Sequence, residues 1–111
     1  MMSRNAWWLR WKQGMINAPA HDLEVVKQIL RRYFPGAEAR VFGSRAGGNA
    51  KPYSDLDIVI VGAAKLDARA LAGAKEEFEE SDIPFRVDVL DWHRISEEFR
   101  QIIARHYEVL W

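Results

Sequence analysis

The spacing of apolar residues predicts two amphipathic helices. The first follows Asp22, a residue type that caps helices, and runs to about Phe34, where Pro35-Gly36 ends it. Its apolar residues recur three and four positions apart, at Leu23, Val26, Ile29, Leu30 and Tyr33. The second helix follows Asp67 and runs to about Ser81. Its inward side consists of Leu71, Ala74 and Phe78.

Segments rich in apolar and β-branched residues predict the strands. Residues 38–42 form one short strand and Phe85–Leu90 another. Leu56–Val61 is a nearly continuous apolar run, which is typical of a strand covered on both faces inside an α/β layer. Val109–Trp111 can add a short edge strand at the end of the chain.

A last helix is expected after the Phe85–Leu90 strand. Asp91 or Ser96 can cap it. Its apolar residues, all expected to be buried, are Ile95, Phe99, Ile102 and Ile103. The order of the elements predicts an α/β (α+β) fold, in which helices pack against a small mixed β-sheet of three to four strands.

Composition narrows the class of protein. The chain has 111 residues, enough for one compact domain, and 16 basic residues balance 16 acidic ones. This balance gives no reason to expect direct binding of nucleic acid. The absence of cysteine removes disulfides and thiolate metal sites and fits a reducing cytoplasm, where we expect the protein. We expect no membrane association, since no apolar run has the length of a membrane span.

Residues 1–20 differ from the rest of the chain. Trp7, Trp8 and Trp11 lie among basic residues, and Gly14 and Pro19 interrupt any regular pattern. We expect a flexible N-terminal extension, as is common for termini, followed by a domain over residues 21–111. The alternative is an aromatic and basic arm that docks on a partner, because Trp and Arg are favoured at interfaces.

The candidate chemistry starts from two aspartates in the central apolar strand. Side chains two residues apart in a strand point to the same face, so Asp55 and Asp57 are expected to lie side by side, about 7 Å apart at the backbone. Two like charges at that spacing repel, and a cation relieves the repulsion. Oxygen ligands without His or Cys indicate magnesium or manganese rather than zinc.

A third carboxylate, Asp88, is central in the Phe85–Leu90 strand. If this strand lies next to the strand of Asp55 and Asp57, the three carboxylates form a group able to hold two metal ions. The alternative is structural, with Asp88 in a buried ion pair with Arg86 or Arg40.

The Gly43-Ser44 turn provides an anion site in this interpretation. Gly43 allows the backbone to approach a ligand closely. Ser44 stands where a helix would begin, so that backbone N–H groups and a hydroxyl can face a phosphate. Phosphates bound at this turn and bridged by metal to Asp55 and Asp57 suit in-line attack on phosphorus.

Together these residues resemble the nucleotidyltransferase superfamily of DNA polymerase β. The segments Val41–Ala46 and Ser54–Ile58 resemble its smallest branch, the minimal nucleotidyltransferases (MNT domains), and so does the segment from Val87 through Phe99 to the chain end. The resemblance covers about residues 22–111. One departure is Gly47, where many members of this branch carry a second arginine.

The resemblance implies a nucleotidyltransferase fold and an antitoxin of a bacterial toxin–antitoxin module. The implied partner is an all-helical HEPN toxin in a hetero-oligomer, and the implied reaction moves AMP from ATP to a tyrosine of that toxin. Gly43 and Ser44 would hold the triphosphate, with Arg45 beside it in a supporting role. Asp55 and Asp57 would bind two Mg²⁺ ions. Asp88 would be the third ligand and the general base.

Two other functions remain open from the sequence. The chain can be an antitoxin that neutralises its partner by contact alone, with a merely structural metal site. It can also be a nucleotidyltransferase acting on small molecules of the aminoglycoside type. The length argues against the second alternative, because one small domain leaves a shallow cleft unless a partner builds the other wall.

Overall fold

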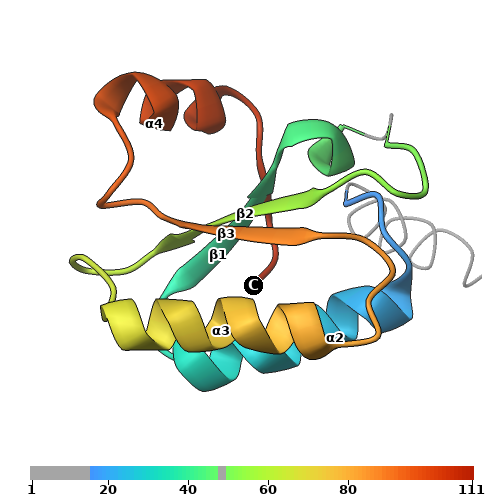
Figure 1. Ribbon diagram of the computed structural model, residues 1–111. Coiled ribbons are helices and arrows are strands. Elements are labelled where there is room, and N and C mark those ends of the chain that lie inside the picture. The colour runs from blue at the N-terminus through green and yellow to red at the C-terminus, as the bar shows by residue number, and fades with distance from the viewer. Residues whose placement is uncertain (1–15, 48–49) are drawn as a thin grey trace, which may run out of the picture.

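A computed structural model of the chain describes residues 16–47 and 50–111 (Figure 1). The helices are α2 (Ala20–Tyr33), α3 (Ala68–Glu80) and α4 (Glu97–Arg105), with a 3₁₀ turn η1 (Gly43–Ala46). The strands are β1 (Glu38–Phe42), β2 (Leu56–Val61), β3 (Val87–Asp91) and β4 (Glu108–Val109). In the described residues, no helix is long and apolar enough to cross a membrane.

The four strands form one mixed sheet in the order β3-β2-β1-β4. Strand β1 is antiparallel to both of its neighbours, β2 and β4. Strands β2 and β3 are parallel, which requires a crossover connection, and helix α3 provides it. The predicted α/β fold with a small mixed sheet is therefore confirmed.

Helices α2 and α3 cover one face of the sheet, and α4 lies on the other side (Figure 1). Alternate residues of the strands point toward α2 and α3, as the two-residue period of a strand requires. These strand residues include Ala39, Val41, Leu56, Ile58, Ile60 and Val89. They pack with Val26, Ile29 and Leu30 of α2 and with Ala74 and Phe78 of α3 in one buried core.

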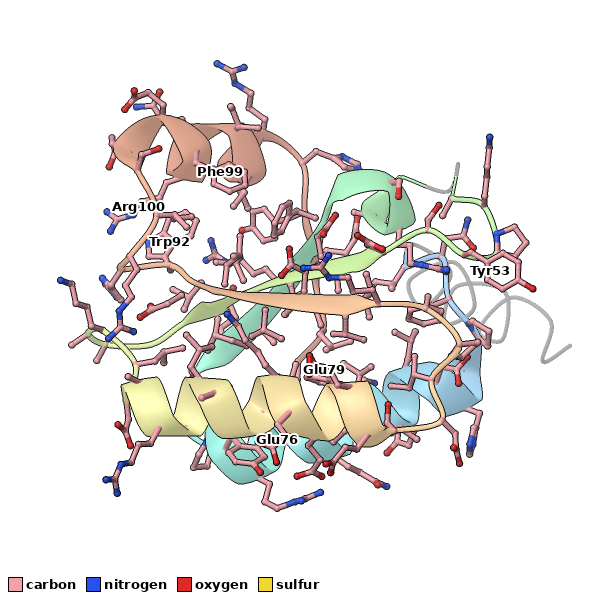
Figure 2. All side chains as sticks on the ribbon, viewed as in Figure 1. Tyr53, Glu76, Glu79, Trp92, Phe99 and Arg100 are labelled. Atoms are coloured by element: carbon pink, nitrogen blue, oxygen red, sulfur yellow. The ribbon has the colours of Figure 1, made fainter. Side chains whose placement is uncertain are left out.

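A second, aromatic cluster holds α4 over the opposite face. The rings of Phe42 in β1 and Phe99 in α4 meet edge to face, 5.7 Å apart. The guanidinium of Arg40 lies 5.3 Å from the ring of Trp92 and 4.5 Å from that of Tyr107. Figure 2 shows Trp92, Phe99 and Arg100 gathered at this end of the molecule, whereas Tyr53 extends into solvent at the other.

Several local predictions are corrected by the structure. Asp22 does not cap the first helix, which begins two residues earlier and has Pro19 at its N-cap. Ser96, and not Asp91, caps α4 through a hydrogen bond from the N–H of Phe99. Ile102 is 58% exposed, because α4 rests on the sheet by a single side and Ile102 faces away from it.

Strand β3 is shorter than predicted at its start. Phe85 is buried but precedes the strand, which begins at Val87. At the N-terminal end, Ile16 and Ala18 pack against the core ahead of α2. The aromatic and basic residues Trp7, Trp8 and Trp11 lie outside the described residues.

Candidate active site

Asp57 and Asp88 lie opposite each other in the neighbouring parallel strands β2 and β3. Both side chains point to the face of the sheet away from α2 and α3, because their sequence neighbours Leu56, Ile58 and Val89 fill the core. The two strands are therefore neighbours, as the sequence interpretation required. Two carboxylates from different parts of the chain meet on one face.

The environment of Asp57 disfavours its negative charge. Burial raises the pKa of the Asp57 carboxyl, and the charges of Asp88 and Asp55 raise it further, in that order of importance. Arg86 acts in the opposite direction and lowers this pKa by a smaller amount. The net result is a carboxyl that holds its proton more readily than an isolated aspartate, as expected where acidic groups gather around a cation site.

Asp55 is exposed at the entrance to β2, and it is close enough for its charge to act on Asp57. In the described part of the chain, no three acidic or imidazole side chains are grouped closely enough to hold one metal ion. The structure thus brings Asp57 and Asp88 together as an opposed pair, with Asp55 at the margin of the pair.

The turn after β1 packs directly against Asp57. Gly43 has a φ of +77°, in the left-handed region that glycine adopts without strain. A Cβ atom at this position would lie 2.6 Å from Oδ2 of Asp57, closer than nonbonded atoms can approach. Gly43 is therefore required twice, once for the backbone angle and once to leave room for the carboxylate.

Ser44 follows Gly43 and is exposed within η1, beside the acidic pair. Arg45 has a different placement. It is only 3% exposed, and its guanidinium donates hydrogen bonds to the backbone carbonyl oxygens of Asn17, Ser54 and Pro52. The sequence interpretation put Arg45 beside phosphates, whereas the structure turns its side chain into the protein, toward the loop that precedes Asp55.

The structural alternative for Asp88 finds no support in the contacts. Among residues 16–47 and 50–111, neither Arg86 nor Arg40 forms an ion pair with Asp88, and Arg40 pairs instead with Glu38. Asp91 is the structural carboxylate of β3. It is 3% exposed and accepts hydrogen bonds from the backbone N–H groups of Leu66 and His93.

Arg86 is a charged neighbour of Asp57 that had only a weak signal in the sequence. Arg86 was considered as an ion-pair partner of Asp88, but the structure leaves it exposed and its charge acts on Asp57. The available signal was the two-residue spacing between Arg86 and Asp88, because residues two apart in an extended segment point to the same face of the sheet. That spacing could not show that Arg86 would act on Asp57, which lies on the neighbouring strand.

Comparison with known proteins identifies the family of the chain. Residues 23–110 match the nucleotidyltransferase domain family, and the chain belongs to it. Its sequence is 45% identical over 97 residues to the probable protein adenylyltransferase MntA of Haemophilus influenzae. The aligned part covers 87% of this chain and 85% of that relative.

Solved structures share the fold. A chain of a toxin–antitoxin structure with AMP-PNP superposes with a TM-score of 0.69 and 24% identity, over 80% of this chain and 72% of that one. A chain from a complex of tri-AMPylated Shewanella oneidensis HEPN toxin with MNT antitoxin gives a TM-score of 0.63. Its identity is 24%, over 81% of this chain and 69% of that one.

Proposed function

We propose that this nucleotidyltransferase transfers AMP from ATP to a tyrosine hydroxyl of a cognate HEPN toxin and acts as its antitoxin. The observation that carries the proposal is the opposed pair Asp57 and Asp88, with the Gly43 turn packed against it. Such an arrangement gives a metal-bridged phosphate chain a place to lie between the turn and the carboxylates. The similarity to a protein adenylyltransferase supports the choice of AMP and of a protein acceptor.

The carboxylates fit a magnesium ion that arrives with its nucleotide. Mg²⁺ is usually held by one or two carboxylates together with substrate phosphates, rather than by a complete protein cage. Asp57 and Asp88 supply such a pair, and Asp55 can add an oxygen at the entrance. The raised pKa of Asp57 is consistent with this use, because a bound cation would remove the repulsion that raises it. When bound, the metal would neutralise charge on the phosphates.

The chain's own residues then perform three tasks. Gly43 and Ser44 hold the phosphate chain by backbone N–H groups, at a position where only glycine leaves room for Asp57. Asp55 and Asp57 would hold the magnesium that neutralises charge at the α-phosphate. Asp88 accepts the proton of the tyrosine hydroxyl while the tyrosine oxygen forms a bond to the α-phosphorus. The bond from the α-phosphorus to the bridging oxygen breaks, and pyrophosphate leaves with that oxygen.

The acceptor hydroxyl is expected on another protein, because the chain is 45% identical to a probable protein adenylyltransferase. The related fold occurs in complexes of MNT antitoxin with HEPN toxin, one of them carrying AMP on the toxin. We infer that this chain forms a hetero-oligomer with a HEPN-type protein. Such a partner also builds the second wall that a domain of this size lacks.

The experiment mixes the purified chain with labelled ATP, magnesium and the HEPN-type protein encoded beside it, and weighs that protein by mass spectrometry. The expected result is the addition of AMP units to a tyrosine, and their loss in the double variant Asp55→Asn/Asp57→Asn. The variant Asp82→Asn serves as the matched control, because Asp82 is an exposed aspartate in the loop after α3.

The same preparations test the alternative of neutralisation by contact. Cells that express the toxin are given either the wild-type chain or one of the variants, and their growth is compared. If the double variant protects as well as the wild type and the toxin gains no mass, the enzymatic proposal is wrong. Protection that disappears together with the AMP units supports it.

A further inference from the structure

Arg45 is a buried arginine whose guanidinium is held by backbone carbonyl groups. Its Nε donates to the carbonyl oxygen of Ser54 at 2.8 Å, and one terminal nitrogen donates to that of Asn17 at 2.6 Å. The other terminal nitrogen donates to the carbonyl oxygens of Pro52 at 2.9 Å and Lys51 at 3.4 Å. One side chain thus joins the segment before α2 to the loop before β2.

Among residues 16–47 and 50–111, no carboxylate forms an ion pair with the buried guanidinium of Arg45. The ion pairs in this part of the chain all involve other arginines. The guanidinium carbon lies 4.0 Å from the centre of the Phe85 ring, which offers its electron-rich face. Burying a charge in this way is costly unless its hydrogen bonds are all made. The contacts therefore indicate a site built for this side chain.

The loop that Arg45 holds is itself a closed turn. The N–H of Ser54 donates to the carbonyl oxygen of Lys51, and the N–H of Lys51 donates to the hydroxyl of Ser54. Ser54 directly precedes Asp55. The carbonyl group that accepts from Arg45 Nε belongs to the peptide that links Ser54 to Asp55, so the clamp acts on the start of the acidic segment.

Arg45 connects this loop to both other parts of the site. Arg45 follows Ser44 directly in η1, so its hydrogen bond to Ser54 fixes the distance between the Gly43-Ser44 turn and Asp55. The ring of Phe85 against its guanidinium precedes β3, the strand that carries Asp88. Arg45 therefore links the three segments that carry Ser44, Asp55 and Asp88.

We propose that Arg45 is a positioning residue that sets the separation of the Gly43-Ser44 turn from Asp55 and Asp57, and does not touch the nucleotide. The proposal rests on the AMP-transfer function given above. The four hydrogen bonds of its guanidinium all go to neutral backbone carbonyl groups, one before α2 and three in the loop before β2. The planar fork is therefore the property that matters, and a lysine cannot replace it.

The test compares AMP transfer by the wild type and Arg45→Lys as a function of magnesium concentration. Lysine keeps the charge, but its compact ammonium lacks the planar fork that reaches carbonyl groups of both segments at once. We expect the half-saturating magnesium concentration to rise about tenfold and kcat to fall by up to about 100-fold, the loss that displacement of reacting groups by ~1 Å can cause. A merely structural residue would lower the melting temperature and leave both constants of the folded enzyme unchanged.

A chemical rescue adds a second readout. Arg45→Ala leaves a space lined by carbonyl oxygens and the Phe85 ring, beneath a surface groove of about 440 Å³ that also reaches Pro19 and Tyr53. Guanidinium ions at constant ionic strength should restore part of the activity of this variant, whereas methylammonium ions should not. Arg69→Lys, in the exposed first turn of α3, is the matched control and should behave as wild type.

A milder variant covers the case in which the Arg45 variants do not fold. Phe85→Leu keeps Arg45 and removes only the ring beneath it, and should give a smaller rise in the magnesium requirement. A wild-type magnesium requirement and kcat in every folded variant would overturn the inference. A wild-type protein that transfers no AMP would instead refute the proposed function, so the two failures are distinguishable.

Discussion

Gly43 and Asp57 fit against each other so closely that any side chain at position 43 would displace the Asp57 carboxylate. A Cβ atom there would lie 2.6 Å from Oδ2 of Asp57 and 3.5 Å from its carboxyl carbon. The backbone angle of +77° adds a second requirement for glycine. The identity of residue 43 and the position of the Asp57 carboxylate are therefore linked.

The first prediction follows from this contact. Gly43→Ala should push the Asp57 carboxylate aside and lower AMP transfer by a factor on the order of 100, the effect of displacing a reacting group by ~1 Å. Left-handed strain should also lower the free energy of unfolding by about 1–3 kcal/mol. Kinetics and urea denaturation measure the two effects separately.

Gly36→Ala is the matched control for this change. A Cβ atom on Gly36 would meet nothing within 4 Å, and its φ lies outside the left-handed region. We expect wild-type kinetics and a change in unfolding free energy within about 0.5 kcal/mol, as for other surface substitutions. Equal activity of Gly43→Ala and Gly36→Ala would contradict the close fit of Gly43 to Asp57.

The second prediction concerns pH. Because burial and two carboxylates raise the pKa of Asp57 above its ordinary 3.8, the folded protein binds this proton more readily than the unfolded chain. The ionised group therefore costs stability above the raised pKa and costs nothing below the ordinary value. Asp57→Asn should raise the free energy of unfolding at pH 7 by up to about 1 kcal/mol, since solvent screens a partly exposed carboxylate.

The gain should disappear as the pH falls below 3.8, because the wild-type carboxyl is then protonated in both states. Urea denaturation at a series of pH values, with a chelator to exclude bound cations, measures this dependence. Asp82→Asn provides the comparison, as an exposed aspartate outside the acidic pair. A gain from Asp57→Asn that is constant with pH would show that repulsion is not its source.

The sequence was sufficient for those features of the site that depend on strand periodicity. The two-residue repeat placed Asp55 and Asp57 on one face, and apolar runs located β2 and the sheet around it. The opposition of Asp57 and Asp88 needed one further fact, that β2 and β3 are neighbours. The α3 crossover between them made this the simplest arrangement, because parallel strands joined by one helix usually pair.

Features that depend on contacts between distant segments could not be predicted. Arg45 follows the turn motif directly, and only the folded structure shows that its side chain turns toward Asn17 and Ser54. The burial of Asp91 likewise depends on a backbone N–H from Leu66, 25 residues earlier. Helical spacing assigned Ile102 to the inside, but which apolar residues are covered is decided by how α4 tilts on the sheet.

The third prediction separates the two aspartates of β3. Asp88→Asn should remove most AMP transfer and change the free energy of unfolding little, because Asp88 forms no ion pair in the described part of the chain. Asp91→Asn should lower the free energy of unfolding by about 1–3 kcal/mol, because it weakens buried hydrogen bonds to Leu66 and His93 and an ion pair with Arg94.

AMP transfer and the free energy of unfolding are measured for both Asp88→Asn and Asp91→Asn, with the activity assay below the melting temperature of the less stable variant. Asp91→Asn is expected to keep the wild-type magnesium dependence, since its side chain contacts the loop after β2 rather than the acidic pair. The reverse result, a stable but inactive Asp91→Asn with an active Asp88→Asn, would exchange the roles assigned to these residues.

The last prediction concerns the attachment of α4. Its Phe99 meets Phe42 edge to face at 5.7 Å, and Phe42 is the register partner of Asp57, so this contact holds the helix beside the acidic pair. Phe99→Ala should lower the free energy of unfolding by about 2–3 kcal/mol, less than for a fully buried ring. Ile102→Ala, in the same helix, should cost about 0.5 kcal/mol or less, because that side chain is 58% exposed. Urea denaturation measures both, and hydrogen exchange should show α4 opening first in Phe99→Ala. Equal costs for the two variants would mean that α4 is not held by the Phe42–Phe99 contact.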